Sequence, residues 1–329
     1  MPQTYLKTLN RCLAGILNGD RIDKDLAGVL SAPSPDEAFS LFAAASRIRQ
    51  HHRGNKVDIC SIVNARSGAC SEDCRFCAQS SHYWTDATVY PLIDPVAIEQ
   101  AAAAARKNKA GRFCIVTSGR GIDDAADLQG IAEGVARVKD LGLSPCATLG
   151  TLSRDQLNTL KSAGLHRYHH NIETSREFFP NICSTHTFDD RADLLHYARE
   201  IGLSTCSGGI LGMGEGMTDR ISMAFSLRDL AVDSVPLNFL MPIPGTPLEK
   251  LRPIEPLEAL VSIALFRFIL PDREIRVCGG RAQLGTLHPF LFMAGADGFM
   301  IGNYLTRTGL DPAADLRMLR ELHLEPAAP

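Results

Sequence analysis

The chain has 329 residues, a formal net charge of −3 and 45% hydrophobic residues, which is the composition of a folded globular protein. The charge leaves no basic surface for nucleic acid, and no segment approaches the ~18 consecutive apolar residues of a membrane-spanning helix. The apolar residues 12–17 are followed directly by charged ones and are too few for a signal peptide. We therefore expect a cytoplasmic protein that binds neither nucleic acid nor membranes.

The order of predicted elements points to a barrel. The first fifty residues carry apolar side chains at helical spacing, and from Lys56 onward short β-rich segments alternate with helical ones. The predicted strands are Val57 to Val63, Arg112 to Ser118, Ser144 to Leu149, Arg167 to Ile172, Ser204 to Leu211, Ser234 to Met241, Glu274 to Cys278 and Gly298 to Ile301. Predicted helices between them include Pro95 to Lys109, Asp124 to Leu141, Ser153 to Ala163 and Phe188 to Ile201.

This regular alternation is typical of a parallel sheet with helices, either open and doubly wound or closed. Eight such units favour an α/β fold of the (β/α)8 TIM-barrel type over the open sheet. We expect an N-terminal helical extension over residues 1–52, the barrel over 53–325 and a disordered tail over 326–329.

Three of the ten cysteines are close together in the sequence. Cys70, Cys74 and Cys77 form the pattern Cys-x-x-x-Cys-x-x-Cys directly after the first predicted strand, where barrel enzymes place their active sites. Thiolate clusters select soft metals, chiefly zinc or iron–sulfur centres. A structural zinc site needs four ligands, and no second pair lies nearby. Three thiolates with an open position therefore predict an iron–sulfur cluster that binds a further molecule.

The cysteine loop resembles the signature of the radical S-adenosylmethionine (radical SAM) superfamily. The resemblance implies that Cys70, Cys74 and Cys77 hold three irons of a [4Fe-4S] cluster, whose fourth iron chelates S-adenosylmethionine. It also implies that Phe76 packs on the adenine. The stretches that begin at Gly68, Cys146, Cys206 and Gly279 further resemble the biotin synthase family, in order and with similar gaps, from Val57 to the C-terminus.

That resemblance implies a second cluster, [2Fe-2S], deep in the barrel as the source of sulfur. Its ligands would be Cys114, Cys146, Cys206 and an arginine that we match to Arg281. The three cysteines fall in three different predicted strands, so their side chains can converge inside one barrel.

The chain departs from the family at Cys60 and Cys278, where the relatives carry serine. Thiolates are better iron ligands than a protonated guanidinium, so both compete with Arg281, and the nuclearity of the inner cluster stays open. Cys278 and Arg281 are three residues apart and cannot both point inward from a regular strand, unless Gly279-Gly280 breaks the alternation. Cys12 and Cys183 match no ligand position, and we interpret them as buried small hydrophobes.

Polar residues alternate along the fourth predicted strand. His169, Asn171 and Glu173 share one face, and the resemblance assigns His169 and Asn171 to substrate and Asn171 and Glu173 to S-adenosylmethionine. The family has asparagine where this chain has His169. By resemblance, Asn238 binds the ureido ring of dethiobiotin. Two apolar side chains are matched to the adenine pocket, and they are Ile210 and Met241.

The resemblance implies a sulfurtransferase that inserts sulfur between C6 and C9 of dethiobiotin to give biotin, with methionine and 5′-deoxyadenosine as co-products. The chemistry belongs to the cofactors, so no side chain is expected to act as a general acid or base. A flavodoxin- or ferredoxin-type reductant and a homodimer are also expected. Two alternatives stay open: a radical SAM enzyme for another small substrate, and a non-catalytic iron–sulfur carrier.

Overall fold

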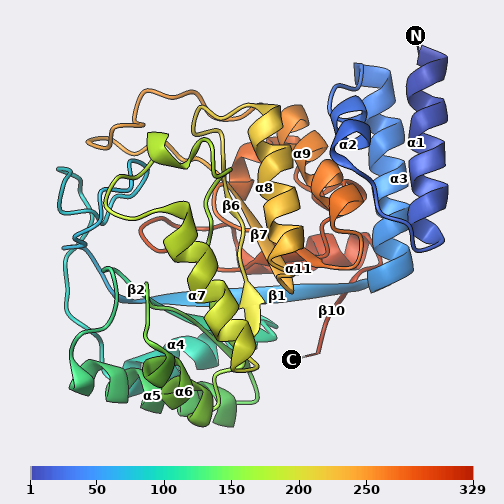
Figure 1. The fold of residues 1–329 in the computed structure, drawn as a ribbon. Helices are drawn as coiled ribbons and strands as arrows, with labels where there is room; N and C mark the ends of the chain where they lie inside the picture. Colours follow the sequence, from blue (N-terminus) through green and yellow to red (C-terminus); the bar gives the residue numbers. More distant parts are fainter. Residues whose placement is uncertain (1, 329) are drawn as a thin grey trace.

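The computed structural model describes residues 2–328. Three helices come first: α1 (Pro2–Leu17), α2 (Lys24–Leu30) and α3 (Pro35–Arg53). Figure 1 shows them side by side at the edge of the molecule, next to α8 and α9. Ser34 and Glu37 form a capping box at the start of α3, which satisfies amide groups that the first helical turn leaves free.

The remaining chain forms a closed parallel barrel, which confirms the predicted fold class. Its strands are β1 (Lys56–Arg66), β2 (Arg112–Thr117), β3 (Ser144–Thr148), β4 (Arg167–His169), β5 (Ser204–Cys206), β6 (Gly209–Leu211), β7 (Ser234–Phe239), β8 (Glu274–Val277) and β9 (Gly298–Met300). They pair in chain order, apart from β6, which lies beyond the end of β5 and also pairs with β7. The pairing of β1 with β9 closes the ring.

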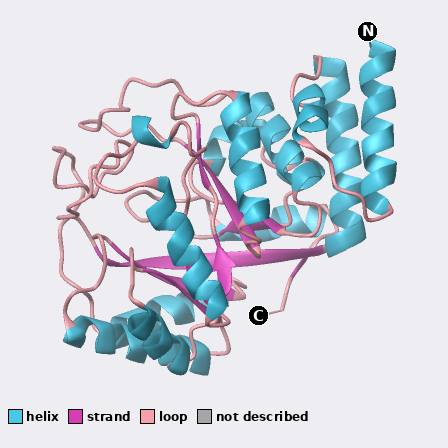
Figure 2. Ribbon diagram, in the orientation of Figure 1, coloured by secondary structure: helices cyan, strands magenta, loops and turns pink. Residues whose placement is uncertain are grey.

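Helices surround this ring and loops gather at one end of it. The helices between the strands are α4 (Pro95–Lys107), α5 (Ala125–Asp140), α6 (Arg154–Ser162), α7 (Phe188–Glu200), α8 (Met217–Asp229) and α9 (Pro256–Ile269). Shorter elements are η1 (Phe179–Asn181), η2 (Arg281–Leu287), α10 (Phe290–Met293), α11 (Pro312–Glu321) and β10 (Glu325–Pro326). Figure 2 shows the long loops at the carboxyl end of β1, where barrel enzymes build their sites. Within residues 2–328, no helix is long and apolar enough to cross a membrane.

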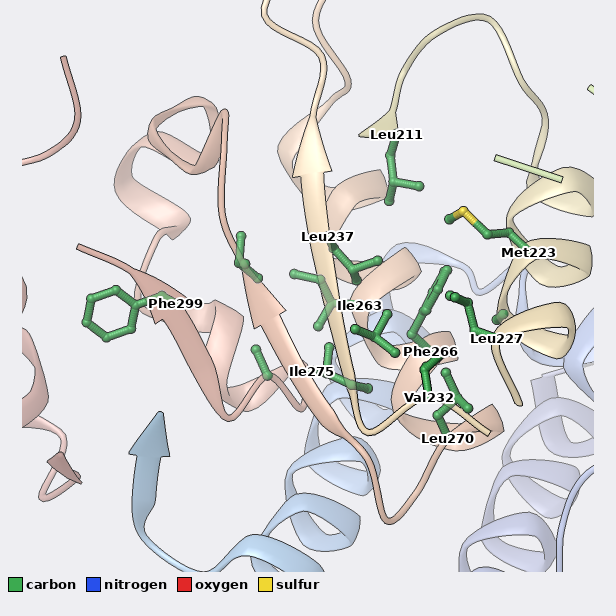
Figure 3. Close-up of a cluster of buried hydrophobic side chains, with 14 of the residues drawn as sticks. Leu211, Met223, Leu227, Val232, Leu237, Ile263, Phe266, Leu270, Ile275 and Phe299 are labelled. Atoms are coloured by element: carbon green, nitrogen blue, oxygen red, sulfur yellow. The ribbon is translucent and has the colours of Figure 1, made fainter. Parts of the chain in front are cut away.

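The apolar core lies between the strands and the helices, not inside the ring. In Figure 3, Leu237 and Ile275 from two strands meet Ile263 and Phe266 from α9, and Leu227 from α8 completes this part of the core. Helix α9 is buried along its length because it lies between the barrel and α3. This arrangement leaves the inward-facing positions of the strands free for polar and sulfur-containing side chains.

The fifth predicted strand is divided into β5 and β6. A Cβ on Gly208 would lie 1.9 Å from the carbonyl oxygen of Pro236, and one on Gly209 would lie 2.1 Å from that of Glu173. Only glycine allows the backbones to approach this closely. The break lets the segment after β5 pair with both β7 and Glu173, four residues beyond the end of β4.

The first residues of the predicted tail lie beside β1. Glu325–Pro326 forms strand β10 beside the start of β1, and the amide of Ala327 donates to the carbonyl of Val57 at 2.8 Å. The backbone hydrogen bonds of an added edge strand hold this segment. Pro329, the last residue of the predicted tail, lies outside the described residues, as does Met1 of the helical extension.

Candidate functional site

The interior of the barrel encloses a cavity of about 340 Å³. It brings together most of the residues that the sequence predicted for the site. Thirteen of these line it: Cys60, Phe76, Cys77, Cys114, Cys146, His169, Asn171, Glu173, Cys206, Ile210, Asn238, Met241 and Cys278. Cys70 and Cys74 belong to the loop at its mouth, and Arg281 lies elsewhere.

The cysteine loop is fixed by its own hydrogen bonds. The amide of Cys77 donates to the carbonyl of Cys74 at 2.9 Å, and the amide of Cys70 donates to that of Gln79 at 3.0 Å. Ser80 donates to the carbonyl of Glu72 at 2.6 Å. Burial raises the pKa of Cys77 to about 11. Further bonds join the loop to the segment after β4, since the amide of Arg75 donates to the carbonyl of Ile182 at 2.9 Å and the amide of Ser184 donates to Asp73 at 2.9 Å.

The spacing of the sulfurs distinguishes a cluster from a single ion. Zinc–sulfur bonds of about 2.3 Å require that the thiolates of one ion lie within ~4.6 Å of one another. Among the described residues, only Cys74, Cys183 and His186 bring three ligand atoms within 4.8 Å. Neither the three loop cysteines nor Cys114, Cys146 and Cys206 form such a group among the described residues. In a polynuclear iron–sulfur cluster each iron takes its own thiolate, so the thiolates need not converge on one ion.

Cys183 is buried as predicted, but it has a neighbour that the sequence did not reveal. Its sulfur lies 3.9 Å from that of Cys74, and the hydrogen bond from Cys74 lowers the pKa of Cys183 to about 4. The ring of His186 is held by Glu72, 2.5 Å from its Nδ1, and by Arg191, whose Nε donates to its Nε2 at 2.9 Å. Both ring nitrogens thus have protein partners, so His186 has no free nitrogen for a metal.

Arg191 connects His186 to the segment that follows β4. Its guanidinium donates to the carbonyl of Asn171 at 2.8 Å and lies 3.6 Å from the carboxylate of Glu173. Glu173 adopts a φ of +66°, a strained conformation that is common at functional sites. Burial raises the pKa of Glu173 and Arg191 opposes this rise. The side-chain oxygen of Asn171 accepts from Gly208 at 3.1 Å, so both residues have fixed orientations at the cavity wall.

Asn238 lines the cavity from β7, separated only by β6 from the segment that carries Asn171 and Glu173. Its side-chain oxygen accepts from the amide of Gly279 at 2.8 Å, and its amide donates to the carbonyl of Gly209 at 3.2 Å. These bonds leave one amide hydrogen for a ligand. Phe76, Ile210 and Met241 supply apolar surface to the same cavity.

The deeper part of the cavity is rich in sulfur. Cys114 and Cys146 are register partners on β2 and β3, and burial and the nearby Cys146 thiol hold the pKa of Cys114 well above its usual value. Burial opposes the ionisation of Cys206, but His169 and Arg276 lower its pKa to about 7. Cys60 and Cys278 pack against each other. Five thiols thus face one enclosed space.

Arg281 does not reach this space, which corrects the sequence-based assignment. Its guanidinium is fully buried in an ion pair with Asp315 and donates to the carbonyl of Met300 at 3.1 Å. The physical reason is the turn at Gly280, which has a φ of +77° and leads the chain out of the barrel. Gly279-Gly280 therefore ends the strand, and the side chain of Arg281 does not point into the cavity.

Arg276 is the arginine that enters the cavity. It lies two residues before Cys278, so the alternation of strand β8 brings both side chains to the inner side. Its guanidinium lies 3.1 Å from Asp58 and 3.0 Å from Glu274. The sequence could have predicted this, because side chains two residues apart on a strand point to the same side, and Arg276 is two residues from Cys278 whereas Arg281 is three.

Charged residues close the barrel below the thiols. Arg112 and Arg276 pair with Asp58, and Arg167 lies 2.6 Å from Glu274. Three cations thus face two carboxylates in a largely buried layer at the amino ends of the strands. This layer has a surplus of positive charge directly below the cysteines.

Comparison with known proteins places these features in a family. The chain matches the model of the Radical SAM superfamily over residues 65–227 and that of the Biotin and Thiamin Synthesis associated domain over 236–325. It is 49% identical over 315 residues to a biotin synthase of Trichlorobacter lovleyi, covering 95% of both chains. It is 47% identical over 322 residues to a biotin synthase of Geobacter metallireducens, covering 97% of both.

Solved structures share the fold. Methylornithine synthase (PylB) superposes with a TM-score of 0.84 at 20% identity over 96% of this chain and 97% of the other. HydG, a maturase of the [FeFe]-hydrogenase, gives 0.81 at 14% identity over 98% of this chain and 76% of the other. These likenesses bear on the barrel alone. On the identity and coverage of its curated relatives, the chain belongs to the biotin synthase family.

Proposed function

We propose that this chain is a biotin synthase, which inserts sulfur into dethiobiotin to form biotin. The observation that carries the proposal is that one cavity has the three-cysteine loop at its mouth and five thiols at its base. A carrier protein would need the cysteines, but it would not need Asn171, Glu173 and Asn238, which line the cavity between the cysteine loop and the thiols at the base. Family membership supports the same reaction.

At the mouth, Cys70, Cys74 and Cys77 would bind the [4Fe-4S] cluster. When bound, this cluster and S-adenosylmethionine supply the radical that removes hydrogen from the substrate. Glu173 would accept hydrogen bonds from the ribose hydroxyls, because an ionised carboxylate is an acceptor only. Phe76 would pack on the adenine. Further apolar contacts to the adenine would come from Ile210 and Met241.

Dethiobiotin would occupy the middle of the cavity, between the two cluster sites. Asn238 would donate its remaining amide hydrogen to the urea oxygen, and Asn171 lies nearby on the other side of β6. The valerate carboxylate of the substrate would extend to the mouth, where Arg307 lines the cavity. No carboxylate among the described residues pairs with Arg307. The protein thus positions the substrate at both ends and keeps water from the reacting carbons.

At the base, Cys114, Cys146 and Cys206 would bind a second iron–sulfur cluster. Arg276 is held by two carboxylates and stays protonated, so it has no lone pair for iron. We therefore propose that the Cys60 and Cys278 pair completes the ligand set.

Iron content tests this ligand set. Cys278→Ser is expected to lower the iron per chain and to change the Mössbauer spectrum of the second cluster. The matched control is Cys12→Ser, because Cys12 is also buried but lies on α1, away from the cavity. Equal iron and equal spectra in wild type and Cys278→Ser would make Cys278 a packing residue.

Turnover tests the function itself. The reconstituted chain, incubated without oxygen with dethiobiotin, S-adenosylmethionine and a strong reductant, should produce biotin and 5′-deoxyadenosine. Deoxyadenosine without biotin would indicate a radical enzyme for another substrate, and neither product from an iron-loaded protein would indicate a carrier. A flavodoxin or ferredoxin as reductant and a homodimer remain part of this proposal, and both can be measured with the same preparation.

A further inference from the structure

His169 lies beside Cys206, a residue proposed for the inner cluster. The two are register partners on the adjacent parallel strands β4 and β5, so their side chains point to the same side. The ring Nδ1 of His169 lies 3.3 Å from the sulfur of Cys206. Both side chains line the cavity.

The position of His169 separates it from Asn171 and Glu173, which carry the proposed cofactor and substrate contacts. His169 is the last residue of β4, whereas Asn171 and Glu173 follow the strand on the way to the mouth. The only hydrogen-bonding partner of its ring within the described chain is the sulfur of Cys206. The charged groups that face the ring are Cys206, Glu173 and Arg276. His169 therefore belongs with the thiols at the base.

We infer that His169 is a positioning residue of the inner metal site, whose ring N–H donates to the sulfur of Cys206. This inference rests on the proposed second cluster, and it replaces the expected contact of His169 with substrate. A metal-bound cysteine is a thiolate and has no proton, so the imidazole must be the donor at Nδ1. A hydrogen bond to a ligand sulfur withdraws electron density from it and stabilises the reduced cluster.

An asparagine at position 169 could take the same role. The amide nitrogen of an asparagine can occupy the place of the imidazole Nδ1, because both follow Cγ in the side chain. His169→Asn therefore keeps an N–H donor near Cys206, whereas His169→Leu keeps the bulk and removes the donor. The pair of variants separates the hydrogen bond from the packing.

The test is a potentiometric titration of the anaerobically purified full-length protein, followed by electron paramagnetic resonance and iron analysis. We expect His169→Leu to shift the second cluster to a more negative potential while His169→Asn stays close to wild type. Loss of the second cluster from the leucine variant alone would also support the donor role. The matched control is Tyr168→Phe, which changes the neighbouring buried residue of β4 outside the cavity and should leave the potential unchanged.

Three results would overturn the inference. The first is equal potentials in wild type and His169→Leu. The second is loss of the cluster from both variants, which would make the imidazole itself a ligand. The third is a wild-type protein with only one cluster per chain, and that result alone would also overturn the proposed inner cluster. The potential of a retained cluster is a readout that a merely structural role would not move.

Discussion

Replacing Arg281 should destabilise the protein without affecting its metal sites. The guanidinium is fully buried, pairs with Asp315 on α11 and lies 4.9 Å from the ring centre of Phe299. Arg281→Met keeps most of the volume but leaves the Asp315 carboxylate, which is 2% exposed, without a cation. Since Arg281 does not line the cavity, the iron per chain should equal that of wild type.

The size of the effect follows from the burial of the pair. Removing one partner of a buried ion pair costs about 3–5 kcal/mol, because the other charge stays buried and uncompensated. At a few degrees per kcal/mol, that corresponds to a fall in Tm of roughly 6–10 °C for a chain of this size. The double variant Arg281→Met/Asp315→Leu removes both charges and should recover much of this loss.

Thermal unfolding by circular dichroism and iron analysis of the same samples form the assay. The expected pattern is a lowered Tm with full iron for Arg281→Met, and a partial recovery for the double variant. An unchanged Tm together with loss of the second cluster would refute the reasoning. In that case Arg281 would be a ligand, as the sequence alone suggested.

Four further outcomes are expected. Cys74→Ala should give a folded barrel that forms no 5′-deoxyadenosine, because one iron loses its thiolate, and product analysis checks this. Glu173→Gln should weaken S-adenosylmethionine binding at normal iron content, since only a charge-assisted hydrogen bond is lost, and equilibrium titration measures the affinity. Arg307→Gln should raise the KM for dethiobiotin with little change in kcat. Arg167, Arg276 and Arg112 lower the pKa of Glu274 against the effect of burial, so its ion pairs stabilise the fold at neutral pH and are lost as the pH falls below about 4. Glu274→Gln should thus be less stable by about 3 kcal/mol at pH 7 and should lack this part of the acid dependence in pH-dependent denaturation.

The fold could be predicted because each strand and helix carries a local signal. Gly142, Gly164 and Gly202 each end a helix in a left-handed conformation. These glycines mark the boundary between a helix and the next strand, so the alternation of strands and helices can be predicted from the sequence. The cysteine loop and the cavity-facing side of β4 were predictable for the same reason, since spacing along one element determines them. The break between β5 and β6 was missed, because it depends on how closely Gly208 approaches a distant carbonyl.

The errors in the site arise where the chain turns. Whether Gly279-Gly280 leads the chain into the barrel or out of it depends on packing against Phe239, which no local pattern reports. The contact of Cys183 with Cys74 depends on the loop after β4 folding back over the cysteine loop, across 109 positions of sequence. Arg276, by contrast, could have been found from the alternation along its own strand.

The charges at the base of the barrel indicate why an anionic group belongs above them. Arg112, Arg167 and Arg276 face only two carboxylates in a largely buried layer, and an unbalanced buried cation is costly unless an anion lies nearby. The same arginines act on the thiols, since Arg276 and Arg167 help to lower the pKa of Cys206 to about 7 against the effect of burial. The thiolates and sulfides of the proposed second cluster would supply this negative charge. The positive charge of the arginine layer therefore favours ionised cysteines above it. Replacing Arg167 or Arg276 by a neutral residue should raise the pKa of Cys206.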